Sequence, residues 1–200
     1  ICLVGSEMCI RDSYNGESNA ISKSAKRGFE IFSGKGNCIA CHLVNEEYAL
    51  FTDEKLHNTG IGFKSSMYVE PPRKKVVLAP GIEVDVDTSV YANDSAFRDE
   101  IMPNDLGLYL ITQDPNDRWK IRTPQLRNVE LSGPYMHNGQ LSTLKEVVEF
   151  YNQGGVTEVG KMKNETISPL MFPLNLTENE VNDLVESVKS LGSIVPIRLP

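Results

Sequence analysis

Five consecutive residues, Cys38-Ile39-Ala40-Cys41-His42, carry the side chains whose spacing says most about chemistry. Two thiols three positions apart lie about one helical turn apart, so both can add to the vinyl groups of one haem. The histidine that follows the second thiol can then reach the iron as an axial ligand. The C-x-x-C-H pattern therefore predicts one covalently attached c-type haem at Cys38, Cys41 and His42.

Two other uses of these cysteines have weaker support. A structural zinc site needs a fourth ligand, and only His57 or His137 is left to supply it. It would give a colourless protein with bound zinc. A thioredoxin-like dithiol needs a strand–helix–strand context, which the surrounding sequence lacks.

Length and composition describe an ordinary globular domain. The chain has 200 residues, of which 40% are hydrophobic and 24% charged, so wholesale disorder is excluded. The 20 basic and 27 acidic residues give a net charge of −7, which argues against nucleic acid as a partner because phosphate binding needs a basic face. No apolar run approaches the ~20 residues of a membrane span, so none is expected.

Residues 1–13 are set apart from the rest of the chain. They lack the basic start and apolar core of a signal peptide, and they resemble the translation of a sequencing adapter. Cys2 and Cys9, which lie in this segment, are therefore assigned no function. The expected domain spans residues 14–200, and its natural N-terminus is expected to be missing.

Helices must position the cysteine–histidine motif. Apolar residues at helical spacing predict a helix over Ser24–Phe32, and Gly34 and Gly36 end it just before Cys38. Two capping boxes predict later helices that begin after Thr143 and Thr177. Residues 82–87 alternate apolar and acidic side chains, as a short exposed strand does. We expect an all-α, cytochrome c-like fold with long loops and at most a short β-hairpin.

Three blocks of sequence resemble the C-terminal haem domain of bacterial di-haem cytochrome c peroxidases, especially the MauG-like branch. The resemblance covers most of residues 28–191, whereas residues 63–102 match nothing specific and look like an insertion. The blocks are residues 36–42 with 51–53 and 57–60, residues 122–129 running into 133–139, and residues 143–155.

The resemblance implies that this chain is the electron-transfer half of a cytochrome-c peroxidase-type oxidoreductase. The peroxide-reducing haem would lie in an N-terminal domain that is missing here, because the chain holds a single C-x-x-C-H motif. The chain by itself is then not expected to be an enzyme. A different class of function also stays open, namely a mono-haem electron carrier complete in one domain.

The sixth iron ligand decides the redox character of such a haem, because methionine raises the potential and a tyrosine oxygen favours oxidised iron. The resemblance to MauG-like proteins implies Tyr151 as this ligand, with Met136 as the runner-up. Alternatively, Tyr151 is a helix residue whose ring packs in the core without binding iron. The sequence also offers other methionines, at Met67, Met102, Met162 and Met171.

Further residues are expected around the haem. Arg122 and Arg127 could pair with its propionates, although surface salt bridges are an equally good use of both. The resemblance implies that His137 lies near the haem. It also implies that backbone carbonyls of Ser132 and Pro134 bind a calcium ion between two haem domains. His57 is expected to be structural, holding the loop after the motif.

Compartment and partners follow from the same chemistry. Haem is attached to C-x-x-C-H motifs on the outer side of the bacterial inner membrane, so we expect a periplasmic protein. The expected electron donor is a small redox protein, either a cytochrome c or a cupredoxin. The resemblance also implies a second copy of the chain as a partner, in a homodimer.

Overall fold

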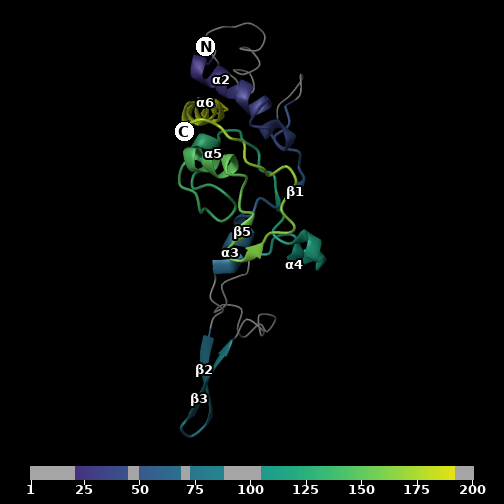
Figure 1. Ribbon diagram of the computed structural model, residues 1–200, viewed down its shortest axis with the longest axis vertical. Helices are drawn as coiled ribbons and strands as arrows, with labels where there is room; N and C mark the ends of the chain where they lie inside the picture. Colours follow the sequence, from purple (N-terminus) through teal and green to yellow (C-terminus); the bar gives the residue numbers. More distant parts are fainter. Residues whose placement is uncertain (1–20, 45–49, 69–72, 88–104, 192–200) are drawn as a thin grey trace, which may run out of the picture.

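Three helices form the body of the molecule. The computed structural model describes residues 21–44, 50–68, 73–87 and 105–191. Helix α2 (Lys23–Ser33), helix α5 (Leu144–Asn152) and helix α6 (Glu178–Lys189) lie together at one end (Figure 1). The adapter-like segment predicted for residues 1–13 lies outside the described residues.

Side-chain caps explain where these helices begin. The Ser22 side chain accepts the N–H of Ala25 at the start of α2, and Gly34 caps its end. Thr143 and Thr177 each begin a complete capping box, with Glu146 and Glu180 as the acidic partners. The three helices predicted from the sequence are confirmed.

Helices α2 and α6 approach each other very closely where they cross. A Cβ built on Gly28 would overlap the carbonyl oxygen of Asp183 and lie 2.7 Å from the Cβ of Ser187. The Asp183 carboxylate then accepts two hydrogen bonds from Arg27, at 2.6 and 2.7 Å. Only glycine fits at position 28 with this helix spacing.

The hydrophobic core lies between these helices and the loops that cross them. Phe32 from α2 packs edge-on against Phe51 at 6.2 Å between ring centroids, and Phe51 is fully buried. The other buried members come from α5, α6 and the segments just before and after α6; they are Leu144, Val148, Leu174, Leu176, Val181, Leu184, Val185 and Leu191.

Short elements complete the body. The turn η1 (Cys38–Ala40) follows α2, and η4 (Val129–Leu131) lies against α6. Strand β1 (Leu56–His57) pairs with β4 (Ile121–Arg122), and β5 (Glu158–Val159) pairs with β6 (Met162–Lys163), both antiparallel. The remaining helical pieces are α3 (Ile61–Tyr68), α4 (Tyr109–Thr112) and η3 (Pro115–Asp117).

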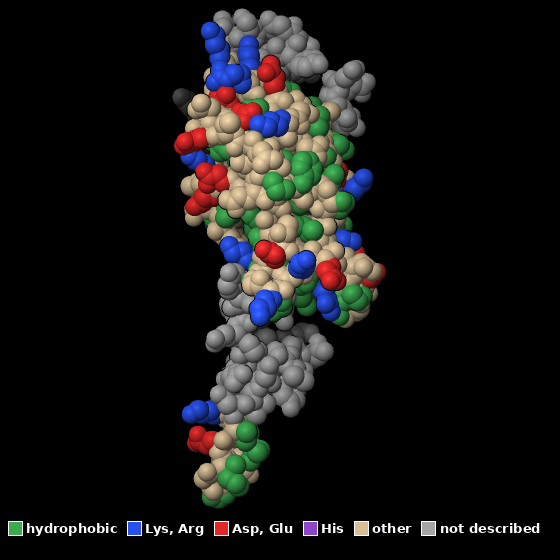
Figure 2. All heavy atoms as spheres, in the orientation of Figure 1, with side chains coloured by type: hydrophobic (Ala, Val, Ile, Leu, Met, Phe, Trp, Pro, Cys, Tyr) green, Lys and Arg blue, Asp and Glu red, His purple; other side chains and the backbone are tan. Residues whose placement is uncertain are grey.

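A hairpin projects from the end of the molecule opposite α2 (Figure 1). It consists of β2 (Arg73–Ala79) and β3 (Ile82–Asp87), joined at Pro80 and Gly81. Gly81 has φ +83°, which a tight turn after proline requires. Apolar side chains at its tip face solvent (Figure 2), with Leu78 68% exposed. The strand predicted over residues 82–87 is confirmed.

The fold-class prediction is confirmed in part. Helices build the core, as expected of a cytochrome-like fold, but the described residues contain three two-stranded antiparallel sheets in place of at most one hairpin. Two of these sheets pair strands of only two residues each, within loops. Strands this short leave no alternation of apolar and polar residues in the sequence. In the part of the chain that the structure describes, no helix is long and apolar enough to cross a membrane.

We expect Gly28→Ala to destabilise the protein. In an exposed helix this change would stabilise by about 0.5–1 kcal/mol, but here the added methyl group forces α2 and α6 apart, at a cost of about 1–3 kcal/mol. Thermal unfolding of the haem-loaded chain measures the effect. Glu30→Ala on the exposed side of α2 is the control, and an unchanged or raised Tm for Gly28→Ala would contradict the close crossing.

Candidate functional site

A cavity of about 380 Å³ lies among α5, α6, η1 and the loops around β4 and η4. Its walls are mostly apolar, with Phe32, Leu144, Val148 and Leu184 shared with the core. Cys38, Cys41 and His42 all line this one cavity. Its volume and lining match those of cofactor sites, which are commonly about 300–1,000 Å³ and largely apolar.

The motif enters the cavity through a tight turn. Asn37 adopts a left-handed conformation with φ 50°, which asparagine tolerates better than most residues. The N–H groups of Cys41 and His42 then both donate to the carbonyl of Cys38. Burial raises the pKa of the Cys38 thiol to about 12 and also raises that of Cys41. Both sulfurs are therefore neutral thiols at pH 7, held on the same wall.

The His42 ring is held by a backbone carbonyl. Its Nδ1 lies 2.7 Å from the carbonyl oxygen of Phe51, which can only accept a hydrogen bond. Nδ1 therefore carries the proton, and Nε2 keeps the lone pair that a metal ligand needs. Burial lowers the pKa of His42, although the Phe51 carbonyl, the Asp53 charge and the Pro124 carbonyl act in the opposite direction. The ring is thus neutral and oriented for ligation.

Phe51 is itself held in an unusual backbone conformation. Its φ of 53° lies in the left-handed region, where a bulky side chain is rare. The Phe51 N–H donates to the carbonyl of Leu43 at 3.1 Å, and the ring is packed in the core against Phe32. Backbone strain of this kind persists only where surrounding contacts fix it, and it gathers at functional sites.

These residues fit a c-type haem. Two thiols from one turn, an imidazole whose Nδ1 is held by a backbone carbonyl and a largely apolar cavity are the parts that covalent haem binding requires. The zinc alternative fits less well. Among the described residues the one group of three metal-ligating side chains joins Cys41 to Asp53 and His57, and leaves out Cys38 and His42.

Three candidate sixth ligands line the same cavity, namely Tyr151, Met136 and Met171. Burial, together with the nearby thiols of Cys41 and Cys38, raises the pKa of Tyr151. A free Tyr151 hydroxyl is therefore protonated at pH 7. Met162 is 56% exposed and does not line the cavity, and Met102 lies outside the described residues.

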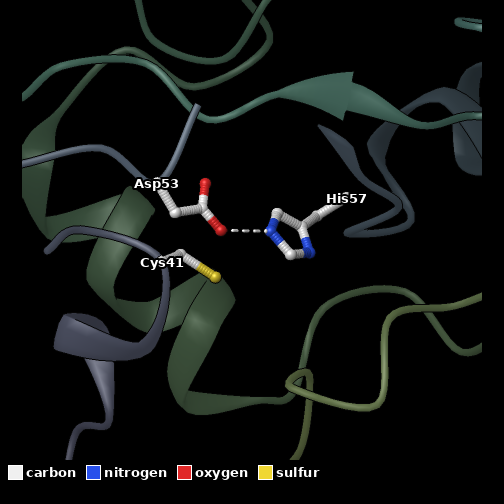
Figure 3. Close-up of side chains that lie close together, drawn as sticks. All are labelled: Cys41, Asp53 and His57. Carbon is white, nitrogen blue, oxygen red and sulfur yellow. Dashed lines mark hydrogen bonds and ion pairs between the residues drawn. The ribbon is translucent and has the colours of Figure 1, made fainter. Parts of the chain in front are cut away.

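Asp53 and His57 stand beside the second cysteine (Figure 3). His57 Nε2 lies 2.8 Å from the Asp53 carboxylate, and the ligand atoms of Cys41, Asp53 and His57 all lie within 4.8 Å of one another. His57 Nδ1 lies 3.4 Å from the Ser168 hydroxyl, so both ring nitrogens have partners. This agrees with the expected structural role of His57, and also places the residue in the wall of the cavity.

The remaining predicted residues divide between the cavity and the surface. Arg122, His137, Ser132 and Pro134 all line the cavity. Arg122 is largely exposed and pairs with Glu54 at 3.2 Å, and His137 pairs with Asp105 at 2.6 Å. Arg127 is half-buried outside the cavity lining, so its contact with a propionate stays a prediction.

Two features of the site were missed by the sequence analysis. The carbonyl of Phe51 has no signature in a sequence, because any residue has a carbonyl. Asp53 carries a weak signal, since it lies four residues before His57 in a segment that resembles the peroxidases.

No family model matches the chain. Among curated proteins, cytochrome-c peroxidase IdrP1 of Denitromonas iodatirespirans is 37% identical over 185 residues, which are 91% of this chain and 44% of that protein. The chain belongs to the family of cytochrome c peroxidases and MauG-like proteins. MauG of Methylorubrum extorquens is 29% identical over 88% of the chain and 36% of its own length. The chain thus spans less than half the length of these relatives.

Solved structures of the peroxidase and MauG-like family agree with this assignment. A MauG-like protein associated with microbial copper homeostasis aligns with a TM-score of 0.57 and 26% identity, over 91% of this chain and 51% of that one. The diheme peroxidase BthA of Burkholderia thailandensis aligns with a TM-score of 0.59 at 23% identity, over 92% and 46% of the two chains. Because its identity is only 23%, the match to BthA supports a similar fold and says nothing of function.

We expect acid to destabilise the protein through Asp53. Burial alone would raise the pKa of this carboxyl, but hydrogen bonds from His57, the Lys55 N–H and Thr123 lower it to about 2. A depressed pKa contributes stability above the unfolded value near 3.8, and that contribution is lost as pH falls toward 2. The contribution is about 2 kcal/mol.

Denaturant unfolding of the haem-loaded chain between pH 5 and pH 2 measures this dependence. Asp53→Asn should be less stable than the wild type at pH 5, and the difference should shrink toward pH 2. Glu54→Asn, at an exposed neighbouring carboxylate, is the control. Parallel stability curves for the wild type and Asp53→Asn would contradict the assignment.

Proposed function

We propose that this chain is the C-terminal haem domain of a periplasmic di-haem cytochrome c peroxidase or MauG-like oxidoreductase. Its role is to pass electrons to a peroxide-reducing haem carried by another domain of the same protein. The observation that carries the proposal is the hydrogen bond between His42 Nδ1 and the Phe51 carbonyl, beside two thiols in one cavity. Relatives named cytochrome-c peroxidase and MauG supply the oxidoreductase class.

In this proposal the attached haem supplies reversible one-electron chemistry. Cys38 and Cys41 would tether it, and the imidazole of His42 would ligate its iron. Phe32, Leu144, Val148 and Leu184 exclude water from the cavity, which limits the reorganisation that accompanies a change of charge. Arg122, on the rim, is the residue of this chain best placed to meet a propionate, since its guanidinium lies at the surface and lines the cavity.

Tyr151 is proposed as the sixth ligand. It lines the cavity, its pKa reflects the nearby thiols of Cys38 and Cys41, and it comes from the rigid helix α5. Burial raises the pKa of Tyr151, so its hydroxyl keeps the proton when no metal ion is bound. Ligation by the phenolate would therefore require the positive charge of the iron to displace that proton. Met136 remains the alternative ligand, in a left-handed loop position with φ 67°.

Calcium and protein partners belong to the longer protein. Ser132 and Pro134 lie at the cavity rim, where their carbonyls could take part in a calcium site completed by the other haem domain. A small redox protein, a cytochrome c or a cupredoxin, is the proposed donor, and a second copy of the chain is the proposed oligomeric partner. The alternative function is a mono-haem electron carrier, which needs no second haem.

The cofactor is tested by producing the chain with c-type haem maturation and measuring haem that resists extraction with acid and organic solvent. We expect one covalent haem per wild-type chain and none in the Cys38→Ser, Cys41→Ser double variant. The matched control, Cys2→Ser with Cys9→Ser, should retain haem fully. Colourless wild-type protein containing zinc would contradict the proposal.

The peroxidase assignment is tested by sequencing the gene from which the chain comes. Reading the source DNA upstream of residue 14 should reveal a second C-x-x-C-H motif within a domain-sized stretch, behind a signal peptide. The full-length product should consume hydrogen peroxide with a reduced donor, and this chain alone should not. A signal peptide directly before residue 14 would favour the mono-haem carrier.

The sixth ligand is tested by near-infrared absorption of the ferric protein. We expect the wild type to lack the sulfur-to-iron band, and Tyr151→Met to gain it, because methionine would then replace the phenolate. Met136→Leu and Met171→Leu, which change two methionines of the cavity, should leave the wild-type spectrum unchanged. A band in the wild type that disappears in Met136→Leu would assign the ligand to methionine.

A further inference from the structure

One buried carboxylate lies beside the haem attachment turn without being a ligand or a tether. The Asp53 side chain is only 4% exposed, and its ligand oxygen lies within 4.8 Å of the Cys41 sulfur (Figure 3). That sulfur is the atom proposed to bond directly to the macrocycle. Asp53 is therefore a buried carboxylate beside the sulfur of the proposed attachment.

Local contacts fix both the position and the charge of Asp53. His57 donates to one carboxylate oxygen at 2.8 Å, and the backbone N–H of Lys55 donates to the other at 3.0 Å. A carboxylate that accepts several hydrogen bonds stays ionised even where water is largely excluded. The second nitrogen of His57 lies by Ser168, so the imidazole cannot turn away without losing that partner.

A fixed negative charge at this place acts on the redox equilibrium. Ferric haem carries one more positive charge than ferrous haem, so a nearby carboxylate stabilises the ferric form. The effect is larger for a buried charge than for an exposed one, because water screens it less.

We propose that Asp53, held against Cys41 by His57, is a positioning residue that lowers the midpoint potential of the attached haem. This inference rests on the proposed function, since it presupposes haem at Cys38 and Cys41. Asp53 acts through its charge and takes no part in bond making. It provides the domain with a way to set its potential that is independent of the sixth ligand.

The adjacent residue offers a matched control. Glu54 is the next residue in the chain and carries the same charge, but its side chain is 62% exposed and paired with Arg122. Removing its charge should alter the potential little, because solvent screens it. Asp53→Glu is the conservative variant, because it keeps the charge and changes only the length of the side chain.

The experiment is a spectroelectrochemical titration of the haem-loaded chain at pH 8, where histidine side chains are ordinarily neutral. Asp53→Asn should raise the midpoint potential by about 59 mV or more, which is a tenfold change in the equilibrium constant for one-electron reduction. Asp53→Glu and Glu54→Gln should stay close to the wild type.

Two results would overturn the inference. One is an unchanged potential in Asp53→Asn that still carries covalent haem. The other is an equal shift in Asp53→Asn and Asp53→Glu, which would reveal a packing effect without a role for charge. Failure of the wild type to retain covalent haem would instead refute the proposed function, and the haem extraction assay separates the two cases.

Discussion

The orientation of His42 depends, beside a weaker contact with the Pro124 carbonyl, on the carbonyl oxygen of Phe51. That carbonyl points at the imidazole only because Phe51 adopts a left-handed backbone conformation, and this conformation is held by the ring packed against Phe32. Phe32 is in turn fixed by α2, whose distance from α6 is set at Gly28. The proposed axial ligand is thus linked, through three contacts, to the close crossing of α2 and α6.

The cavity and the core are parts of one structure. Leu144, Val148 and Leu184 belong to the buried cluster and also line the cavity, so the helices that form the core also form the cavity wall. Most of the lining surface is apolar, and His42, Tyr151 and His57 are among the polar side chains that reach it. An apolar site with a few oriented polar groups is how proteins combine tight cofactor binding with control of its chemistry.

Local features of the fold could be predicted from the sequence, and features formed by distant segments could not. The capping boxes at Thr143 and Thr177 place two helices, and the alternation over residues 82–87 places a strand, because each depends on near neighbours. Cys38, Cys41 and His42 line one cavity for the same reason, since they are close neighbours in the sequence, and haem attachment there stays a prediction.

The paired strands β1 and β4 join residues more than 60 positions apart, and two-residue strands carry no periodicity. The contact of Asp53 with Cys41 escaped prediction because it forms only when the segment after Phe51 lies against the turn that carries Cys41.

The left-handed conformation of Phe51 has a consequence for the order of events during folding. Such a conformation costs about 1–3 kcal/mol for a bulky residue, so a chain without its core populates it rarely. Until Phe32 and Phe51 pack together, the imidazole of His42 lacks its main hydrogen-bond acceptor. The other two histidines of the sequence, His57 and His137, can then compete for the iron of a tethered haem. Correct ligation is therefore a late event that reports completion of the core, and misligated chains are the kinetic traps to expect on the way.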